Sequence, residues 1–181
     1  FDCLCKNDTP DIVLISGDLT YNGERTSHDE MKAALKKLQQ KGKRVYVITA
    51  THDYTTPRMP TYGIDKNDKY IEVESVNRTQ LLKYYGDFGY NNAIAKHKST
   101  MSYVAQLADG YRLFALNDDY GDPDCGFSDE LMNWVKTEAN NAKRDGQYII
   151  AMTHHPLVPP SPIYAAVAKG DMLNEYELRR N

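Results

Sequence analysis

Three predicted strands of this chain end in residues that could carry chemistry. The first ends in Gly17-Asp18, the second in Thr51-His52-Asp53 and the third in His154-His155-Pro156. Carboxylate and imidazole groups gathered at neighbouring strand ends suit a hydrolytic centre of divalent metal ions, because carboxylate can bridge two ions and neutral imidazole can complete each shell. A Gly-Asp pair alone is more typical of a turn, and a lone histidine is more often structural than a ligand. The prediction of a metal site therefore rests on the recurrence of these groups at three strand ends.

The first of these strands is predicted at Ile12–Ser16, a short β-branched run bounded by Pro10 and Gly17. Its continuous apolar character predicts a strand that is buried on both faces of a parallel sheet. Gly17 allows a sharp turn where the strand ends, so that Asp18 is presented at the carboxyl edge, where open α/β sheets bind their ligands.

The second strand is predicted to lie parallel to the first. Ser27 and Glu30 form a capping-box pair that predicts a helix running to about Lys41, and Arg44–Thr49 is the β-branched strand that follows. Strand, helix and strand form a βαβ unit, whose two strands are adjacent and parallel. The carboxyl end of the second strand, with its histidine and carboxylate, should therefore lie beside Asp18.

The remaining elements are predicted from turn and capping signals. They are a long polar loop of lid-like length at Thr55–Ser75, a short helix from Asn77 to Tyr85, a hairpin of Met101–Leu107 with Tyr111–Leu116, a helix from Ser128 to Gly146, a strand at Gln147–Thr153, and a final helix from Asp171 to Arg180. Three polar residues, Asn117, Asp118 and Asp119, end the hairpin. They could line a site or form only a turn, and the sequence leaves both interpretations open.

Composition limits the class of protein. A chain of 181 residues with 41% apolar and 26% charged residues predicts a single soluble globular domain over residues 1–181. A net charge of −3 gives no basic field, so no nucleic-acid partner is expected, and no apolar stretch is long enough for a membrane span. Oligomeric state is left open. Cys3, Cys5 and Cys125 are predicted to be unpaired thiols. Because the sequence starts at Phe1, we expect a trimmed chain or a fragment.

The order of these motifs resembles a known family. GDLTYNGE, then a strand ending in a His-Asp pair, then a strand ending in HHP, is similar to the calcineurin-like metallophosphoesterase superfamily, in particular to its bacterial, often exported members. The resemblance implies an α/β fold, an αββα sandwich of two mixed sheets flanked by helices. It also implies two divalent metal ions (Mn, Fe, Zn or similar), a phosphate-ester substrate and an exported or cell-envelope location.

The resemblance also implies roles for four residues. Asp18 corresponds to the aspartate that bridges the two metals, and His154 corresponds to a metal-binding histidine. Thr51 occupies the position of a metal-binding asparagine, and His52 corresponds to the acid that protonates the leaving group. Activity would then be the hydrolysis of a phosphate monoester or diester by a metal-activated hydroxide.

Departures from the family pattern leave a second interpretation open. The family's opening D-x-H and closing GHxH motifs are not found in residues 1–181, so we expect a domain that is incomplete at both ends. Ala50 stands in a glycine position, and a threonine hydroxyl at Thr51 is a weaker metal ligand than an asparagine amide oxygen. The alternative is a non-catalytic protein of the same fold that binds a phosphorylated ligand or a partner.

Overall fold

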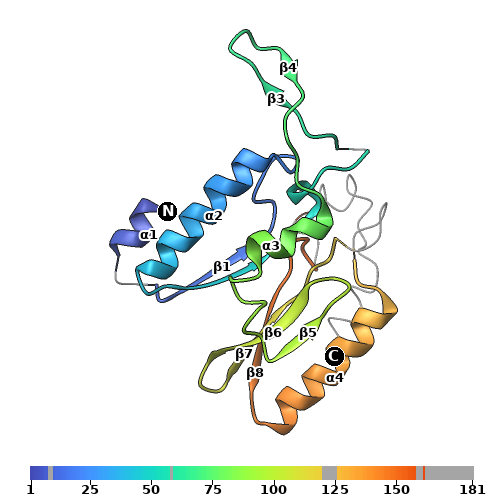
Figure 1. The fold of residues 1–181 in the computed structure, drawn as a ribbon. Coiled ribbons are helices and arrows are strands. Elements are labelled where there is room, and N and C mark those ends of the chain that lie inside the picture. The colour runs from blue at the N-terminus through green and yellow to red at the C-terminus, as the bar shows by residue number, and fades with distance from the viewer. Residues whose placement is uncertain (8–9, 58, 120–125, 158–160, 162–181) are drawn as a thin grey trace. The chain divides into compact units, whose positions relative to one another are not determined.

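A computed structural model describes residues 1–181 except 8–9, 58, 120–125, 158–160 and 162–181 (Figure 1). The chain folds as two compact units, Phe1–Asn92 and Ala93–Asn181. The predicted single domain over residues 1–181 stays a prediction. The predicted final helix at Asp171–Arg180 and the thiol of Cys125 lie outside the described residues, whereas Cys3 and Cys5 are free, as predicted.

The first unit is built on the predicted βαβ arrangement. Its elements are α1 (Asp2–Lys6), β1 (Ile12–Ser16), α2 (Arg25–Gln40), β2 (Arg44–Ile48), the 3₁₀ turn η1 (Thr51–Asp53), β3 (Gly63–Ile64), β4 (Tyr70–Ile71), the 3₁₀ turn η2 (Arg78–Gln80) and α3 (Leu81–Tyr85). Strands β1 and β2 are parallel, with Ile12 opposite Arg44 and Ser16 opposite Ile48. The two strand ends that carry the candidate chemistry therefore lie side by side.

Two details of the βαβ prediction are wrong. Helix α2 begins at Arg25 rather than after Ser27, because Glu24 still forms an extended bridge to Ser75 and the chain turns helical directly after that bridge. Strand β1 is not buried on both faces, since Leu14 is 41% exposed. Among the described residues β1 pairs only with β2, so the strand with the continuous apolar pattern is an edge strand here.

The core of the first unit lies between β2, α2 and α3. Its side chains are fully or almost fully buried: Leu35, Leu38, Val45, Val47, Ile48, Val76, Leu81, Tyr85 and Phe88. Burial of a side chain of this size contributes about 1.5–3 kcal/mol to stability. Asn77 and Gln80 form the predicted capping box at the start of η2, which continues into α3.

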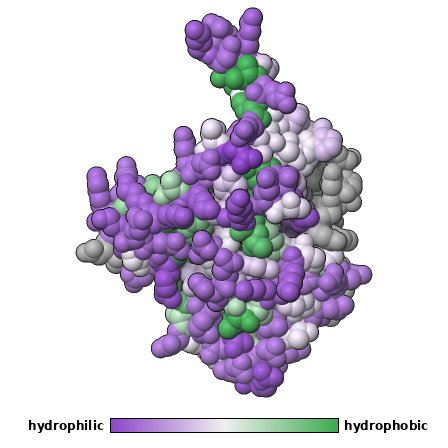
Figure 2. All heavy atoms as spheres, in the orientation of Figure 1, coloured by the Kyte–Doolittle hydropathy of each residue, from purple (hydrophilic) through white to green (hydrophobic). Residues whose placement is uncertain are grey.

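A small hairpin lies within the predicted long loop at residues 55–75. Strands β3 and β4 are antiparallel, and in Figure 1 the hairpin stands away from α2 and β1. Figure 2 shows apolar atoms on this hairpin below a hydrophilic tip, and Ile64 and Ile71 are its exposed aliphatic residues. The segment that leads back from the hairpin is fixed to the start of α2, because Arg25 N donates to Glu74 O at 2.9 Å and Val76 N donates to Gly23 O at 2.8 Å.

In its described residues, the second unit is a four-stranded sheet with one long helix. Its elements are β5 (Ala95–His97), β6 (Ser102–Ala108), β7 (Tyr111–Ala115), α4 (Asp129–Arg144) and β8 (Tyr148–Met152), and the strand order is β5-β6-β7-β8. The predicted β6–β7 hairpin is confirmed, β8 runs parallel to β7, and the short strand β5 was not predicted. Ser128 caps α4 as predicted, with its Oγ accepting the Leu131 N–H at 3.2 Å.

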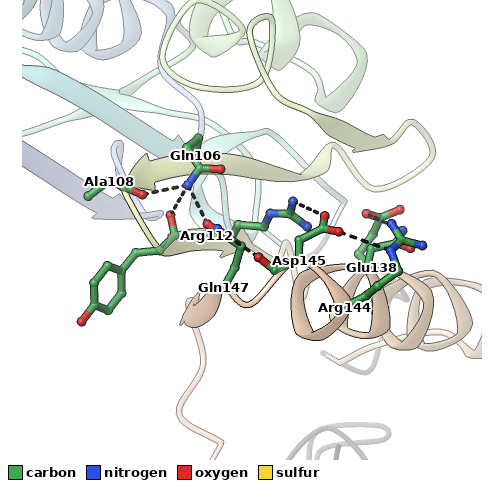
Figure 3. A network of polar contacts seen from close by, with 9 residues as sticks. Gln106, Ala108, Arg112, Glu138, Arg144, Asp145 and Gln147 are labelled. Atoms are coloured by element: carbon green, nitrogen blue, oxygen red, sulfur yellow. Dashed lines mark hydrogen bonds and ion pairs between the residues drawn. The ribbon is translucent and has the colours of Figure 1, made fainter.

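Apolar packing and a polar network join the parts of the second unit. The core of the sheet and α4 comprises Val104, Phe114, Leu116, Phe127, Leu131, Met132, Val135 and Ala142. At one edge, Gln106 Nε2 donates to Ala108 O at 2.7 Å and to Gln147 Oε1 at 2.8 Å (Figure 3). Arg112 from β7 pairs with Asp145 at the end of α4 at 2.7 Å. These contacts hold β6, β7 and the connection from α4 into β8 together.

The helices were compared with the requirements of a membrane-spanning helix. None of the helices in the described part of the chain combines the length and the apolar character that a bilayer crossing requires.

Candidate functional site

The ends of β1 and β2 approach each other so closely that only a glycine fits on one side. Gly17 has a φ of 95°, and a Cβ built on it would lie 2.6 Å from the Cβ of Ala50. Left-handed backbone and lack of space both require glycine here. Asp18 follows with a φ of 52°, a region that Asp tolerates better than most residues, and it is exposed.

The side chain of Asp53 links the loop after β1 to the turn after β2. Its Oδ1 accepts the backbone N–H of Leu19 at 2.6 Å and of Thr20 at 3.2 Å, and its Oδ2 accepts the N–H of Ala50 at 2.8 Å. Asp53 is fully buried, and burial raises the pKa of its carboxyl to about 6, although the three backbone N–H groups act in the opposite direction. The buried carboxylate thus connects the loop after β1 to the turn after β2 through three hydrogen bonds.

His52 is held in one orientation by the loop after β1. Its backbone N–H donates to Asp18 Oδ1 at 3.1 Å, while its ring Nδ1 lies 2.6 Å from Tyr21 O and 2.9 Å from Asn22 Oδ1. Asn22 Nδ2 donates to Pro60 O at 3.3 Å, which sets the orientation of the Asn22 amide. Because both neighbours of Nδ1 are acceptors, Nδ1 carries a proton, and Nε2 is the nitrogen that can gain or lose one.

A buried histidine, His28, forms a hydrogen bond with the backbone of Asp53. His28 of α2 has its Nε2 2.9 Å from Asp53 O and its Nδ1 2.5 Å from the Tyr85 hydroxyl. The carbonyl must accept, so Nε2 carries the proton and Nδ1 accepts from Tyr85. Burial lowers the pKa of His28, which favours this neutral form. His28 therefore links the backbone of Asp53 to Tyr85 of α3.

We expect the free energy of unfolding to depend on His28 as the pH falls from about 7 to about 5. The unfolded chain binds a proton to this histidine at a pH where the folded protein does not, so the contribution of neutral His28 is present above the ordinary pKa of about 6.5 and is lost below it. Urea unfolding over this range should show a steeper loss for the wild type than for His28→Gln, which can hydrogen-bond without titrating. Parallel pH curves for the two proteins would contradict the assignment.

The structure groups three of the four predicted site residues. Asp18, Thr51 and His52 lie on adjoining turns of the first unit, with Thr51 half-buried at the start of η1. His154 lies in the second unit, in the turn after β8, and its ring is perpendicular to that of His155 with centroids 4.7 Å apart.

The sequence left open whether Asp118 lines a site or only forms a turn. Asp118 is fully buried, and its Oδ2 accepts the backbone N–H of His155 at 2.8 Å, while its Oδ1 lies 3.2 Å from His155 Nδ1. Asp118 is thus more than a turn residue, since it fixes the turn that carries His154.

The contact between Asp118 and His155 was not predicted from the sequence. Strands β7 and β8 are parallel with Ala115 opposite Met152, and Asp118 and His155, each three residues beyond that pair, are hydrogen-bonded to each other. Predicting the pairing of these two strands would have brought the acidic cluster and the two histidines together.

A comparison with known protein families shows to which family this chain belongs. A family model described as calcineurin-like phosphoesterase matches residues 1–180. The chain belongs to the calcineurin-like phosphoesterase family. No curated protein matches it. Membership confirms the suspected superfamily and the α/β fold class, and it shows a chain from a family of metal-dependent phosphoester hydrolases.

The donor types of this phosphoesterase chain fit a divalent ion. Asp18 is an exposed carboxylate at a strand end, and His154 is an imidazole held in a fixed turn. Asp53 is unsuited to this role because its two oxygens already accept three backbone N–H groups. Within the described ranges, no group of three or more His, Cys, Asp or Glu side chains is arranged to hold a metal ion.

Proposed function

We propose that this protein hydrolyses a phosphate monoester or diester with the help of two divalent metal ions, and that His52 is the general acid. The observation that carries the proposal is the fixed orientation of His52, whose Nδ1 faces two acceptors and whose backbone N–H is bonded to Asp18. Asp18, Thr51 and His154 would hold the metal ions, which when bound supply an activated hydroxide and neutralise phosphoryl charge.

His52 has the properties that a general acid needs. With Nδ1 protonated and anchored by Tyr21 O and Asn22, only Nε2 exchanges its proton, so protonated Nε2 donates to the departing ester oxygen and takes a proton back afterwards. The bond from the His52 backbone to Asp18 fixes the distance between the acid and the candidate metal-binding carboxylate.

The experiment that tests this proposal is a hydrolysis assay with and without metal. We expect the protein to release phenol from phenyl phosphate when manganese is present, and to lose this activity in a chelator. Diphenyl phosphate in the same assay separates monoesterase from diesterase. No metal-dependent release from either ester would overturn the proposal.

Thr51 separates the enzyme from a non-catalytic member of the same family that binds a phosphorylated ligand or a partner. A threonine hydroxyl is shorter than an asparagine amide and donates its oxygen less well, so an enzyme with Thr51 should hold one ion loosely. We therefore expect Thr51→Asn to tighten metal binding and to raise activity at low manganese concentration. Titration calorimetry with manganese and phosphatase assays measure both.

In a non-catalytic protein the rest of the site has changed as well, and Thr51→Asn rescues neither quantity. Thr51→Val, which keeps the shape of threonine but has no hydroxyl, is the matched control and should weaken metal binding in the enzyme. A folded Thr51→Asn protein with metal affinity and activity both at background would favour the non-catalytic alternative.

A further inference from the structure

Three tyrosines form a continuous row that starts beside His52. The ring centroid of Tyr21 lies 6.2 Å from that of His52, the ring of Tyr62 lies 5.8 Å from Tyr21, and the ring of Tyr70 lies 4.7 Å from Tyr62. Both tyrosine pairs have edge-to-face geometry, with interplanar angles of 78° and 88°. We call Tyr21, Tyr62 and Tyr70 the tyrosine row.

Two members of the tyrosine row are exposed although their rings are apolar, and Tyr62 between them is half-buried. Tyr21 is 63% exposed and Tyr70 is 74% exposed. Clustered large apolar groups on a surface are unusual in comparison with single exposed ones, and they commonly mark a binding site. The row continues onto the β3–β4 hairpin, because Tyr62 directly precedes β3 and Tyr70 begins β4. Core packing therefore does not explain the row.

Tyr21, the first residue of the row, is anchored through its backbone and its hydroxyl. Tyr21 N donates to the carboxylate of Glu24 at 3.1 Å, and Tyr21 O lies 2.6 Å from His52 Nδ1. The Tyr62 hydroxyl donates to the Tyr21 hydroxyl at 3.3 Å, which links the two side chains. A rigid aromatic side chain loses little conformational entropy when it binds a ligand, which makes it a good contact surface.

We propose that the tyrosine row binds the leaving group of the substrate, and that this leaving group is an alcohol that carries a planar ring, as a nucleoside does. The inference rests on the proposed role of His52 as general acid. An ester oxygen that takes a proton from His52 lies about 3 Å from its ring nitrogen. The Tyr21 ring lies 6.2 Å from the His52 ring, so a planar group attached to that oxygen is within reach of Tyr21.

A pair of substrates with the same ester bond isolates this contact. Adenosine 5′-monophosphate and ribose 5-phosphate both release a primary alcohol, and only the first carries a planar base. We expect kcat/KM to be roughly 10-fold higher for the nucleotide, because a base stacked on an aromatic side chain gains affinity without hydrogen-bond specificity. Tyr21→Leu should bring this ratio close to one, and Tyr21→Phe, which keeps the ring, should preserve it.

Two further variants test whether the effect is specific to the tyrosine row. Tyr62→Leu should also lower the ratio, and it does so without altering the residue whose carbonyl anchors His52. Tyr148→Leu is the matched control, because Tyr148 is 69% exposed and lies at the opposite end of β8 from His154; it should leave the ratio unchanged. Thermal unfolding confirms that each variant is folded.

Binding of adenosine itself separates this inference from the proposed function. We expect adenosine to bind with a Kd in roughly the millimolar range, followed by NMR titration, and Tyr21→Leu to weaken binding about fivefold or more. If neither phosphate is hydrolysed but adenosine binds in this Tyr21-dependent way, the ring site stands and the hydrolytic function fails. A wild-type ratio near one, a ratio unaffected by Tyr21→Leu, or no adenosine binding below about 10 mM would each overturn the inference.

Discussion

His52→Ala should lower the rate of phenyl phosphate hydrolysis by roughly 10²- to 10⁴-fold. The variant has no imidazole Nε2 to protonate the departing phenolate, while Asp18, Thr51 and His154 are unchanged. Steady-state assays on the manganese-loaded protein measure the loss, and elemental analysis should find nearly the same metal content in both proteins.

A second ester shows whether this loss comes from proton transfer. The loss in His52→Ala should be much smaller for 4-nitrophenyl phosphate, because its leaving group needs little protonation. Both esters carry a single phenyl ring, so any contact with the tyrosine row is matched between them. Equal losses for the two esters would indicate that His52 is structural or holds metal rather than acting as an acid.

Asp53→Ala should lower the free energy of unfolding by about 3–5 kcal/mol. The substitution leaves the N–H groups of Leu19, Thr20 and Ala50 without the carboxylate that accepts them. Urea unfolding at pH 7 measures the loss, and activity should fall with it because the turn of His52 is no longer fastened to the loop after β1.

Asp53→Asn is the matched control for size. Its one amide oxygen can still accept from Leu19 and Thr20, but its NH₂ group faces the N–H of Ala50, so we expect an intermediate cost of about 1–3 kcal/mol. A cost below about 1 kcal/mol for Asp53→Ala would show that water or a shifted backbone replaces the three bonds.

Local signals in the sequence predicted the parts of the fold that depend on neighbouring residues. The strands at Ile12 and Arg44, the hairpin of Met101–Leu107 with Tyr111–Leu116 and the cap at Ser128 each follow from a short pattern, and each is present. The parallel pairing of β1 with β2 followed from the length of the connection, and it located Asp18 beside the turn of His52.

The features that the sequence did not predict depend on distant residues. The hairpin β3–β4 has only two residues in each strand, too few for an alternating pattern to indicate it. The early start of α2 depends on the bridge between Glu24 and Ser75, and the exposure of Leu14 depends on which strands pair with β1.

Within the site, residue types were predictable but their partners were not. An aspartate directly after a histidine was visible in the sequence, whereas the burial of Asp53 and its three backbone bonds were not. The anchoring of His52 by Asn22 and the pairing of Asp118 with His155 link residues about thirty or more positions apart, and nothing local indicates such contacts.

Glu24 couples the motion of the loop after β1 to that of α2. It is the residue before the first helical turn, and its carboxylate oxygens accept the N–H groups of Asn22 at 2.9 Å and Tyr21 at 3.1 Å. The loop cannot open without releasing these bonds, and the first turn of α2 cannot fray without moving their acceptor. Both segments should therefore open and close as one cooperative unit, with the same hydrogen-exchange protection for Tyr21, Asn22 and the His28 amide. The ring of Tyr21 and the carbonyl that orients His52 would then be ordered or lost together, so that the His52 ring is held in place only when the tyrosine row is also in place.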